Sequence, residues 1–163
     1  MMIRFSETNE TSYRPTNEDC LMRAVTSPNF CKVCIEGLWL SLLSRVNFID
    51  DVHEGCQWHS TESPNSKGHW KRTLEIHLVP LAQFRDDRDA ASIKAAESYT
   101  ITWSKGGKAL EMFTNKTRLE LDDETAVGTY TIDVKYATDE VRVDKDGLLI
   151  SGGDYTVAKR CGA

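Results

Sequence analysis

Residues 73–78 read Thr-Leu-Glu-Ile-His-Leu, and their apolar side chains alternate with polar ones. A period of two residues is typical of a strand with one buried face. Further short strands are expected downstream, at Tyr99–Trp103, Ala109–Phe113, Arg118–Leu121, Thr129–Tyr136, Glu140–Val143 and Asp154–Val157. A series of short strands about 8–12 residues apart predicts an antiparallel β-sandwich.

Two details of this region are similar to the immunoglobulin-like sandwich. Trp103, which is followed by the turn Gly106-Gly107, looks like the core tryptophan on a central immunoglobulin strand. Residues 122–130, Asp-Asp-Glu-Thr-Ala-Val-Gly-Thr-Tyr, resemble the approach to a tyrosine corner, with Tyr130 as the corner residue. Ile132 stands where the second inter-sheet cysteine would be, so we expect an Ig-like sandwich without a disulfide.

Upstream of the strands, the apolar spacing changes to that of a helix. Ser27 is the expected N-cap and Pro28 the first helical residue of a helix that continues from Phe30 to about Val46. Apolar side chains lie on nearly all sides of this helix. A helix of that kind is expected to be buried on more than one side.

The segment from Tyr13 to Trp39, YRPTNEDCLMRAVTSPNFCKVCIEGLW, resembles the IgA peptidase-like zinc metallopeptidases, particularly their fungal members. In that family a Cys-Leu-Met turn, here Cys20-Leu21-Met22, lies beneath the catalytic metal, so the resemblance implies that Met22 is a structural Met-turn residue. The strand-rich region also looks like the C-terminal module of the fungal relatives. The motif H-E-x-x-H, which carries two zinc ligands and the catalytic glutamate of such enzymes, does not occur in the chain.

The resemblance therefore implies a non-catalytic fragment or remnant that acts as a binding or assembly module. We assign no catalytic, cofactor-binding or metal-ligating residue, and zinc is implied only for complete family members. Two alternatives stay open: part of an active zinc metallopeptidase whose catalytic segment is supplied elsewhere, or a plain structural or interaction protein. The expected fold class is α+β, with a helical Met-turn-like segment at 1–59, a Ser/Pro/Asn/Gly-rich linker at 60–68 and the Ig-like sandwich at 69–163.

One group of cysteines and a histidine has the spacing of a zinc site: Cys31, Cys34, Cys56 and His59. Cys31 and Cys34 fall in the expected helix among apolar neighbours, which favours packing, or a disulfide involving Cys20 or Cys56. The acidic pairs Asp50-Asp51, Asp86-Asp87 and Asp122-Asp123 are expected to be solvated loop carboxylates.

The composition also restricts the classes of partner. A net charge of −5 argues against nucleic acid or an anionic membrane surface as the main partner. No apolar run approaches the roughly 20 residues of a transmembrane helix, and residues 1–12 have no signal-peptide pattern. We expect a cytoplasmic chain, or an extracellular one if it is a fragment of an exported peptidase. The expected partner is another protein or a second copy, bound through the helix at residues 30–46.

Overall fold

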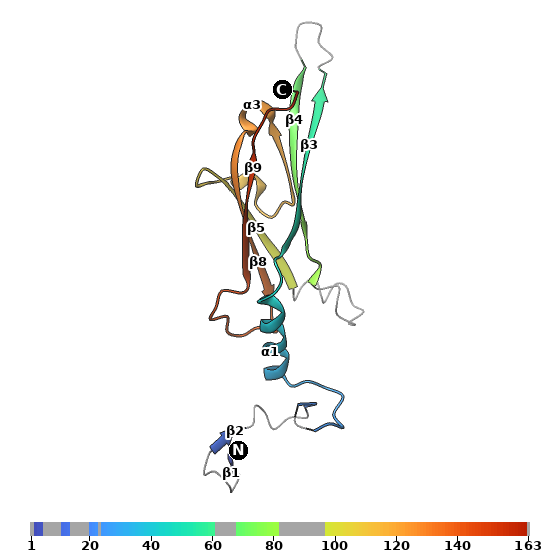
Figure 1. The fold of residues 1–163 in the computed structure, drawn as a ribbon, viewed down its shortest axis with the longest axis vertical. Coiled ribbons are helices and arrows are strands. Elements are labelled where there is room, and N and C mark those ends of the chain that lie inside the picture. Colours follow the sequence, from blue (N-terminus) through green and yellow to red (C-terminus); the bar gives the residue numbers. More distant parts are fainter. Residues whose placement is uncertain are drawn as a thin grey trace. The chain divides into compact units, whose positions relative to one another are not determined.

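The computed structural model describes residues 2–4, 11–13, 20–22, 24–60, 68–81 and 97–162 (Figure 1). The chain divides into two compact units. Unit 1 comprises residues 1–45 and 139–146, and unit 2 comprises residues 46–138 and 147–163. The class is α+β and mostly antiparallel sheet, as expected from the sequence. None of the helices in the described part of the chain has the length and apolar content that a bilayer crossing requires.

Unit 1 contains one main helix, α1 (Lys32–Leu43), and a two-stranded pair of β1 (Met2–Arg4) and β2 (Thr11–Tyr13). The helix begins later than expected, with Cys31 at the N-cap position and no side-chain cap. Ser27 is not the cap, because its hydroxyl is used in a local turn and accepts the backbone N–H of Asn29 at 3.2 Å. Within the described residues Leu43 is the one fully buried residue of α1, so its burial on several sides stays a prediction.

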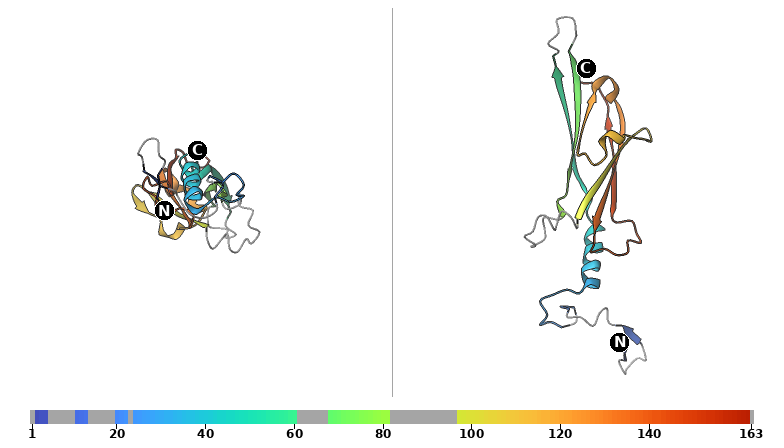
Figure 2. Two further views of the ribbon diagram at one scale, coloured as in Figure 1. Left: turned by 90° about the horizontal axis from the view of Figure 1, so that it is seen from below. Right: turned by 180° about the vertical axis from the view of Figure 1, so that it is seen from behind.

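Unit 2 consists of two antiparallel sheets that face one another (Figures 1 and 2). The first sheet has the order β3-β4-β7, with β3 (Ile49–His59), β4 (His69–Leu78) and β7 (Arg118–Asp122). The second has the order β6-β5-β8-β9, with β6 (Lys108–Ala109), β5 (Glu97–Lys105), β8 (Gly128–Thr138) and β9 (Ile150–Val157). A short 3-10 helix, η2 (Glu111–Phe113), and a four-residue helix, α3 (Asp123–Ala126), complete the described elements of unit 2.

The alternating apolar residues of these strands form the core of unit 2. Leu74 and Ile76 of β4 are buried, as their period-two pattern predicts. Across from them, Trp103 is fully buried and its indole N–H donates to the carbonyl of Lys116 at 2.8 Å. An aromatic contact also joins the layers, because the Phe48 ring lies 5.8 Å from that of Tyr136. The expected burial of Trp103 is confirmed.

The Gly106-Gly107 turn is where the sequence places it. Both glycines have positive φ, at 56° and 78°, and Lys105 pairs with Lys108 across them. A two-residue hairpin requires this conformation, which glycine adopts without a steric penalty. The expected strand at Ala109–Phe113 is largely wrong, since β6 ends at Ala109 and η2 follows.

Three further expectations about organisation differ from the structure. Residues 49–59, which fall in the helical segment expected at 1–59, instead form β3, which pairs with β4 along its length. The segment expected as an inter-domain linker at 60–68 instead joins these two paired strands, and its residues 61–67 lie outside the described residues. Residues 140–143 form no strand and belong to unit 1.

The sandwich is not free of disulfides, because Cys56 is bonded to Cys161. The boundary expected at residues 60–68 leaves Cys56 outside the sandwich, so the sequence offers no partner for Cys161 there. Cys56 lies on β3 of the first sheet, whereas Cys161 follows β9 of the second. The disulfide therefore connects the edge of one sheet to the C-terminal segment that leaves the other.

Candidate cysteine cluster and binding surfaces

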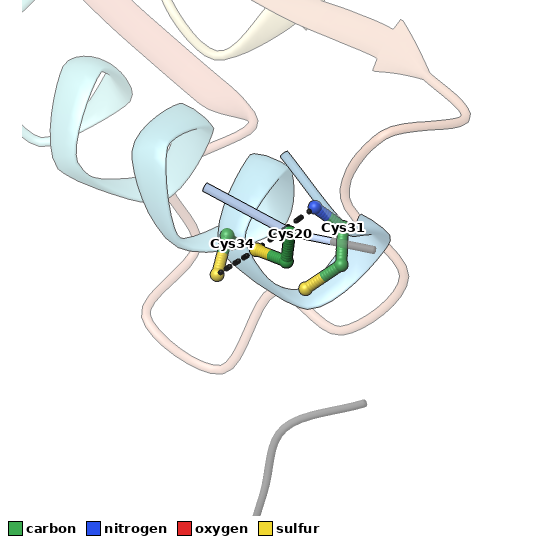
Figure 3. Close-up of side chains that lie close together, drawn as sticks. All are labelled: Cys20, Cys31 and Cys34. Carbon is green, nitrogen blue, oxygen red and sulfur yellow. Dashed lines mark hydrogen bonds between the residues drawn. The ribbon is translucent and has the colours of Figure 1, made fainter. Parts of the chain in front are cut away.

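Three cysteines of unit 1 meet at the start of α1 (Figure 3). Cys31 directly precedes the helix and Cys34 lies in its first turn, so a spacing of three residues places both on one side. Cys20 is brought to them by the segment that folds back along residue 29, where Leu21 N–H donates to the carbonyl of Asn29 at 2.6 Å. The turn is closed by Ala24 N–H, which donates to the carbonyl of Cys20 at 2.9 Å.

The three sulfur atoms lie within 4.8 Å of one another. The Sγ atoms of Cys20 and Cys34 are 3.5 Å apart, and the backbone N–H of Cys31 donates to the Cys20 sulfur at 3.3 Å. Cys20 and Cys31 are buried, whereas Cys34 is half-buried. The cluster thus presents three soft donor atoms to one small volume.

The thiols have unequal acidities. The backbone hydrogen bond from Cys31 is the largest influence on Cys20 and lowers the pKa of its thiol to about 7. Cys34 donates a hydrogen bond to the Cys20 sulfur, and this bond raises the pKa of the Cys34 thiol to about 12. The arrangement therefore favours one thiolate, on Cys20, held by hydrogen bonds from its neighbours.

The zinc spacing seen in the sequence is not assembled as a site. Cys56 has no thiol to offer, because it forms the disulfide with Cys161. His59 instead stacks on His69 across the β3–β4 pair, with ring centroids 5.9 Å apart. Cys31 and Cys34 do lie together, but their third sulfur neighbour is Cys20, which spacing alone did not indicate.

One side of α1 presents a shallow apolar depression of about 170 Å³, lined by Ile35, Leu38, Trp39 and Leu42. These positions repeat at i, i+3, i+4 and i+7, which is the spacing of a helix-pairing stripe. Leu38 is 55% exposed and Leu42 is 42% exposed. We call these four residues the α1 stripe.

Beside the α1 stripe, the helix carries a polar attachment to residues 139–146. Glu36 accepts the backbone N–H groups of Arg142 and Val143 at 2.8 and 3.1 Å, and its second oxygen lies 2.5 Å from Arg142 Nη2. The Arg142 hydrogen bonds are the main cause of the lowered pKa of Glu36. Glu36 thereby holds residues 142–143 against the helix within unit 1.

A buried charge network lies in unit 2 beside the disulfide. Arg72 is 2% exposed and donates to one oxygen of Asp123 at 2.9 and 3.1 Å, to the carbonyl of Lys159 at 2.5 Å and to Glu54. The other Asp123 oxygen accepts the backbone N–H of Cys161 at 2.9 Å. Burial would raise the pKa of Asp123, but the hydrogen bond from Cys161 and the Arg72 guanidinium together lower it. Asp123 was expected to be a solvated loop carboxylate, and this is wrong.

An open cavity of about 490 Å³ adjoins this network and the disulfide. Its apolar wall is formed by Trp58 and Trp70, whose rings meet edge to face with centroids 5.3 Å apart. Its polar wall includes Asp122, Glu124 and Arg160. No sequence motif indicated this cavity, because its walls come from four separate parts of the chain.

Met22, the expected Met-turn residue, lies in a turn next to the cysteine cluster and is 73% exposed. It therefore does not fill a gap in a core. Within the described residues, the cysteine cluster is the one group of three or more His, Cys, Asp or Glu residues whose donor atoms are close enough to share a metal ion. Comparisons of the chain with protein-family models, curated proteins and solved structures give no match.

Proposed function

We propose that the chain is a non-catalytic assembly module that resembles the C-terminal region of an IgA peptidase-like zinc metallopeptidase. It acts through protein–protein contact, and its α1 stripe pairs with the same stripe of a second copy. The observation that carries this proposal is the apolar depression of α1, in which Leu38 and Leu42 remain substantially exposed.

The chemistry of α1 is compatible with self-pairing. The helix carries only two charged residues, Lys32 and Glu36, and Glu36 is already paired with Arg142. Lys32 lies one turn before Ile35 on the same side of α1, so an antiparallel pairing of two stripes keeps the two lysines apart. Burial contributes about 25 cal/mol per Å² of apolar surface. One helix face is small compared with the roughly 800 Å² per partner of a standard interface, so the dimer should be weak and concentration-dependent.

We also propose that unit 2 is an Ig-like sandwich that serves as a scaffold. Two features support this: the buried Trp103 on a central strand, and the buried Tyr130, whose hydroxyl donates to the carbonyl of Ala126 at 2.7 Å. A tyrosine that bonds to the backbone a few residues upstream is typical of a tyrosine corner. The disulfide departs from that pattern, because it joins β3 to the C-terminal segment.

The peptidase resemblance favours a second candidate, in which the chain completes an active zinc metallopeptidase whose catalytic segment is supplied elsewhere. The exposed Met22 and the 38% exposure of Leu21 support it, because a Met-turn needs a metal-bearing segment to cover it. In that case α1 and the Met22 turn would both contact the missing segment.

Sedimentation velocity over a range of concentrations tests the first proposal. The native chain should shift from monomer to dimer as concentration rises, and Leu38→Glu or Leu42→Glu should abolish the shift. Ser41→Glu is the matched control, since Ser41 is an exposed residue of the same helix that does not line the depression. A monomer at every concentration, or a dimer that survives both leucine variants, would refute self-pairing. Zinc-dependent, chelator-sensitive cleavage of casein by the chain alone would refute the non-catalytic assignment.

A further inference from the structure

We propose that Cys20, Cys31 and Cys34 form a zinc-binding site (Figure 3). The sulfur atoms lie within 4.8 Å of one another, and the Cys20–Cys34 pair is 3.5 Å apart. In a tetrahedral thiolate site with Zn–S bonds of about 2.3 Å, neighbouring sulfurs are about 3.8 Å apart. Shifts of about 1 Å or less would place the three sulfurs at three corners of that tetrahedron.

The backbone around the cluster is arranged to stabilise thiolates, which are the form that binds a metal. The N–H of Cys31 already donates to the Cys20 sulfur at 3.3 Å. Cys31 and Cys34 lie at the N-terminal end of a 12-residue helix, where the helix dipole favours negative charge. Removing the protons of the second and third thiols costs free energy when no cation is present. The double positive charge of a zinc ion makes both deprotonations favourable.

A metal uses all three sulfurs, whereas oxidation does not. A Cys20–Cys34 disulfide would release two protons and transfer two electrons to an oxidant, such as a small-molecule disulfide. It would leave the third thiol, Cys31, buried beside the new bond. A disulfide uses two of the three thiols, whereas all three sulfur atoms lie close together. Both facts favour binding of a metal ion over formation of a disulfide.

Thiolate donors select zinc, copper(I) or iron–sulfur clusters, and three thiolates with an open fourth position suit a single zinc ion. Among the described residues no histidine or carboxylate completes the set. The fourth position is therefore left to solvent or to another ligand. Bound zinc would fasten the turn containing Met22 to the start of α1.

The test is metal titration of the full chain with its three thiols reduced and its Cys56–Cys161 disulfide intact. Cobalt(II), used as a spectroscopic substitute, should give an intense thiolate-to-metal charge-transfer band that saturates at one ion per chain. Zinc should displace it, and native mass spectrometry should show a single zinc ion. Cys34→Ser should weaken binding by at least about tenfold, because it removes one of three charged donors.

Two variants separate ligation from folding. Cys34→His supplies another zinc donor at the same position and should retain stoichiometric binding even if the serine variant is destabilised. Val33→Ser alters the exposed neighbouring residue of the helix and should bind zinc as the native chain does. Three outcomes would overturn the site: no cobalt band with three thiols still titratable, a band unchanged in Cys34→Ser, or a Cys20–Cys34 disulfide mapped in the natively purified chain.

Discussion

Removal of the buried Asp123 carboxylate should destabilise unit 2 more than removal of an exposed carboxylate such as that of Asp122. Its partner Arg72 is 2% exposed, and Asp123 is 5% exposed, so the pair is almost fully withdrawn from water. Asp123→Ala would leave the Arg72 guanidinium with Glu54 and one carbonyl oxygen, and would leave the Cys161 N–H without its acceptor. Breaking a buried ion pair on one side costs about 3–5 kcal/mol.

The retained contact to Glu54 places the expected loss for Asp123→Ala at about 3 kcal/mol, the low end of that range. Asp123→Asn keeps an acceptor oxygen and loses only the charge, so it should cost about 1–2 kcal/mol, closer to the value of a single hydrogen bond. Asp122→Ala is the matched control, because Asp122 is exposed and its side chain makes no cap bond to α3. It should stay within about 0.5 kcal/mol of the native chain.

Urea unfolding followed by tryptophan fluorescence measures these differences in the oxidised chain. The pH dependence gives a second readout. Because the folded pKa of Asp123 is lowered from the ordinary value of 3.8, its contribution is present above pH 3.8 and is lost as the pH falls through the folded pKa. The native chain should therefore lose more stability on acidification than Asp123→Asn does. A cost below about 0.5 kcal/mol for Asp123→Ala, the range of ordinary surface changes, would refute the argument.

The sequence predicted those strands that have one buried face. The burial of β8 alternates strictly between Tyr130 and Tyr136, and β4 follows the same rule around Leu74 and Ile76. An amphipathic strand has a period of two residues in its sequence, because every second side chain packs in the core. This is why the α+β class and the positions of the central strands were predictable.

The edge strand β3 gave no such signal. None of its eleven residues is buried, and its sequence, IDDVHEGCQWH, contains no regular alternation. β3 is a strand because it pairs with β4, and this pairing is a tertiary contact that its own sequence does not indicate. Because β3 gives no strand signal, Cys56 falls outside the expected sandwich, and the expectation of a sandwich without a disulfide follows from that.

The candidate site was predictable only in part for a related reason. The sequence placed Cys31 and Cys34 together, since both lie at the start of one helix. The approach of Cys20 depends on the backbone contact between residues 21 and 29, which no periodicity encodes. Likewise, Arg72 and Asp123 are 51 residues apart and come together only because β4 pairs with β7.

Three further expectations follow from the packing of unit 2. Trp103→Ala should lower the free energy of unfolding by about 3–5 kcal/mol, because the indole is fully buried. Trp58→Ala should lower it by about 1 kcal/mol or less, because Trp58 is half-exposed, and urea unfolding measures both. Cys161→Ser removes a bond that closes a loop of 105 residues and should cost about 2–5 kcal/mol, with the loss absent when native and variant chains are both compared under reducing conditions. The last expectation concerns the boundary of the sandwich. A truncated chain of residues 46–163 should melt cooperatively in calorimetry, because it keeps every strand of both sheets. A chain of residues 69–163 loses β3, its whole ladder with β4 and one partner of the disulfide, so it should melt non-cooperatively or not fold. If the shorter chain melts as sharply and at the same temperature as the longer one, β3 does not belong to the folding unit, and the boundary lies at residues 60–68 after all.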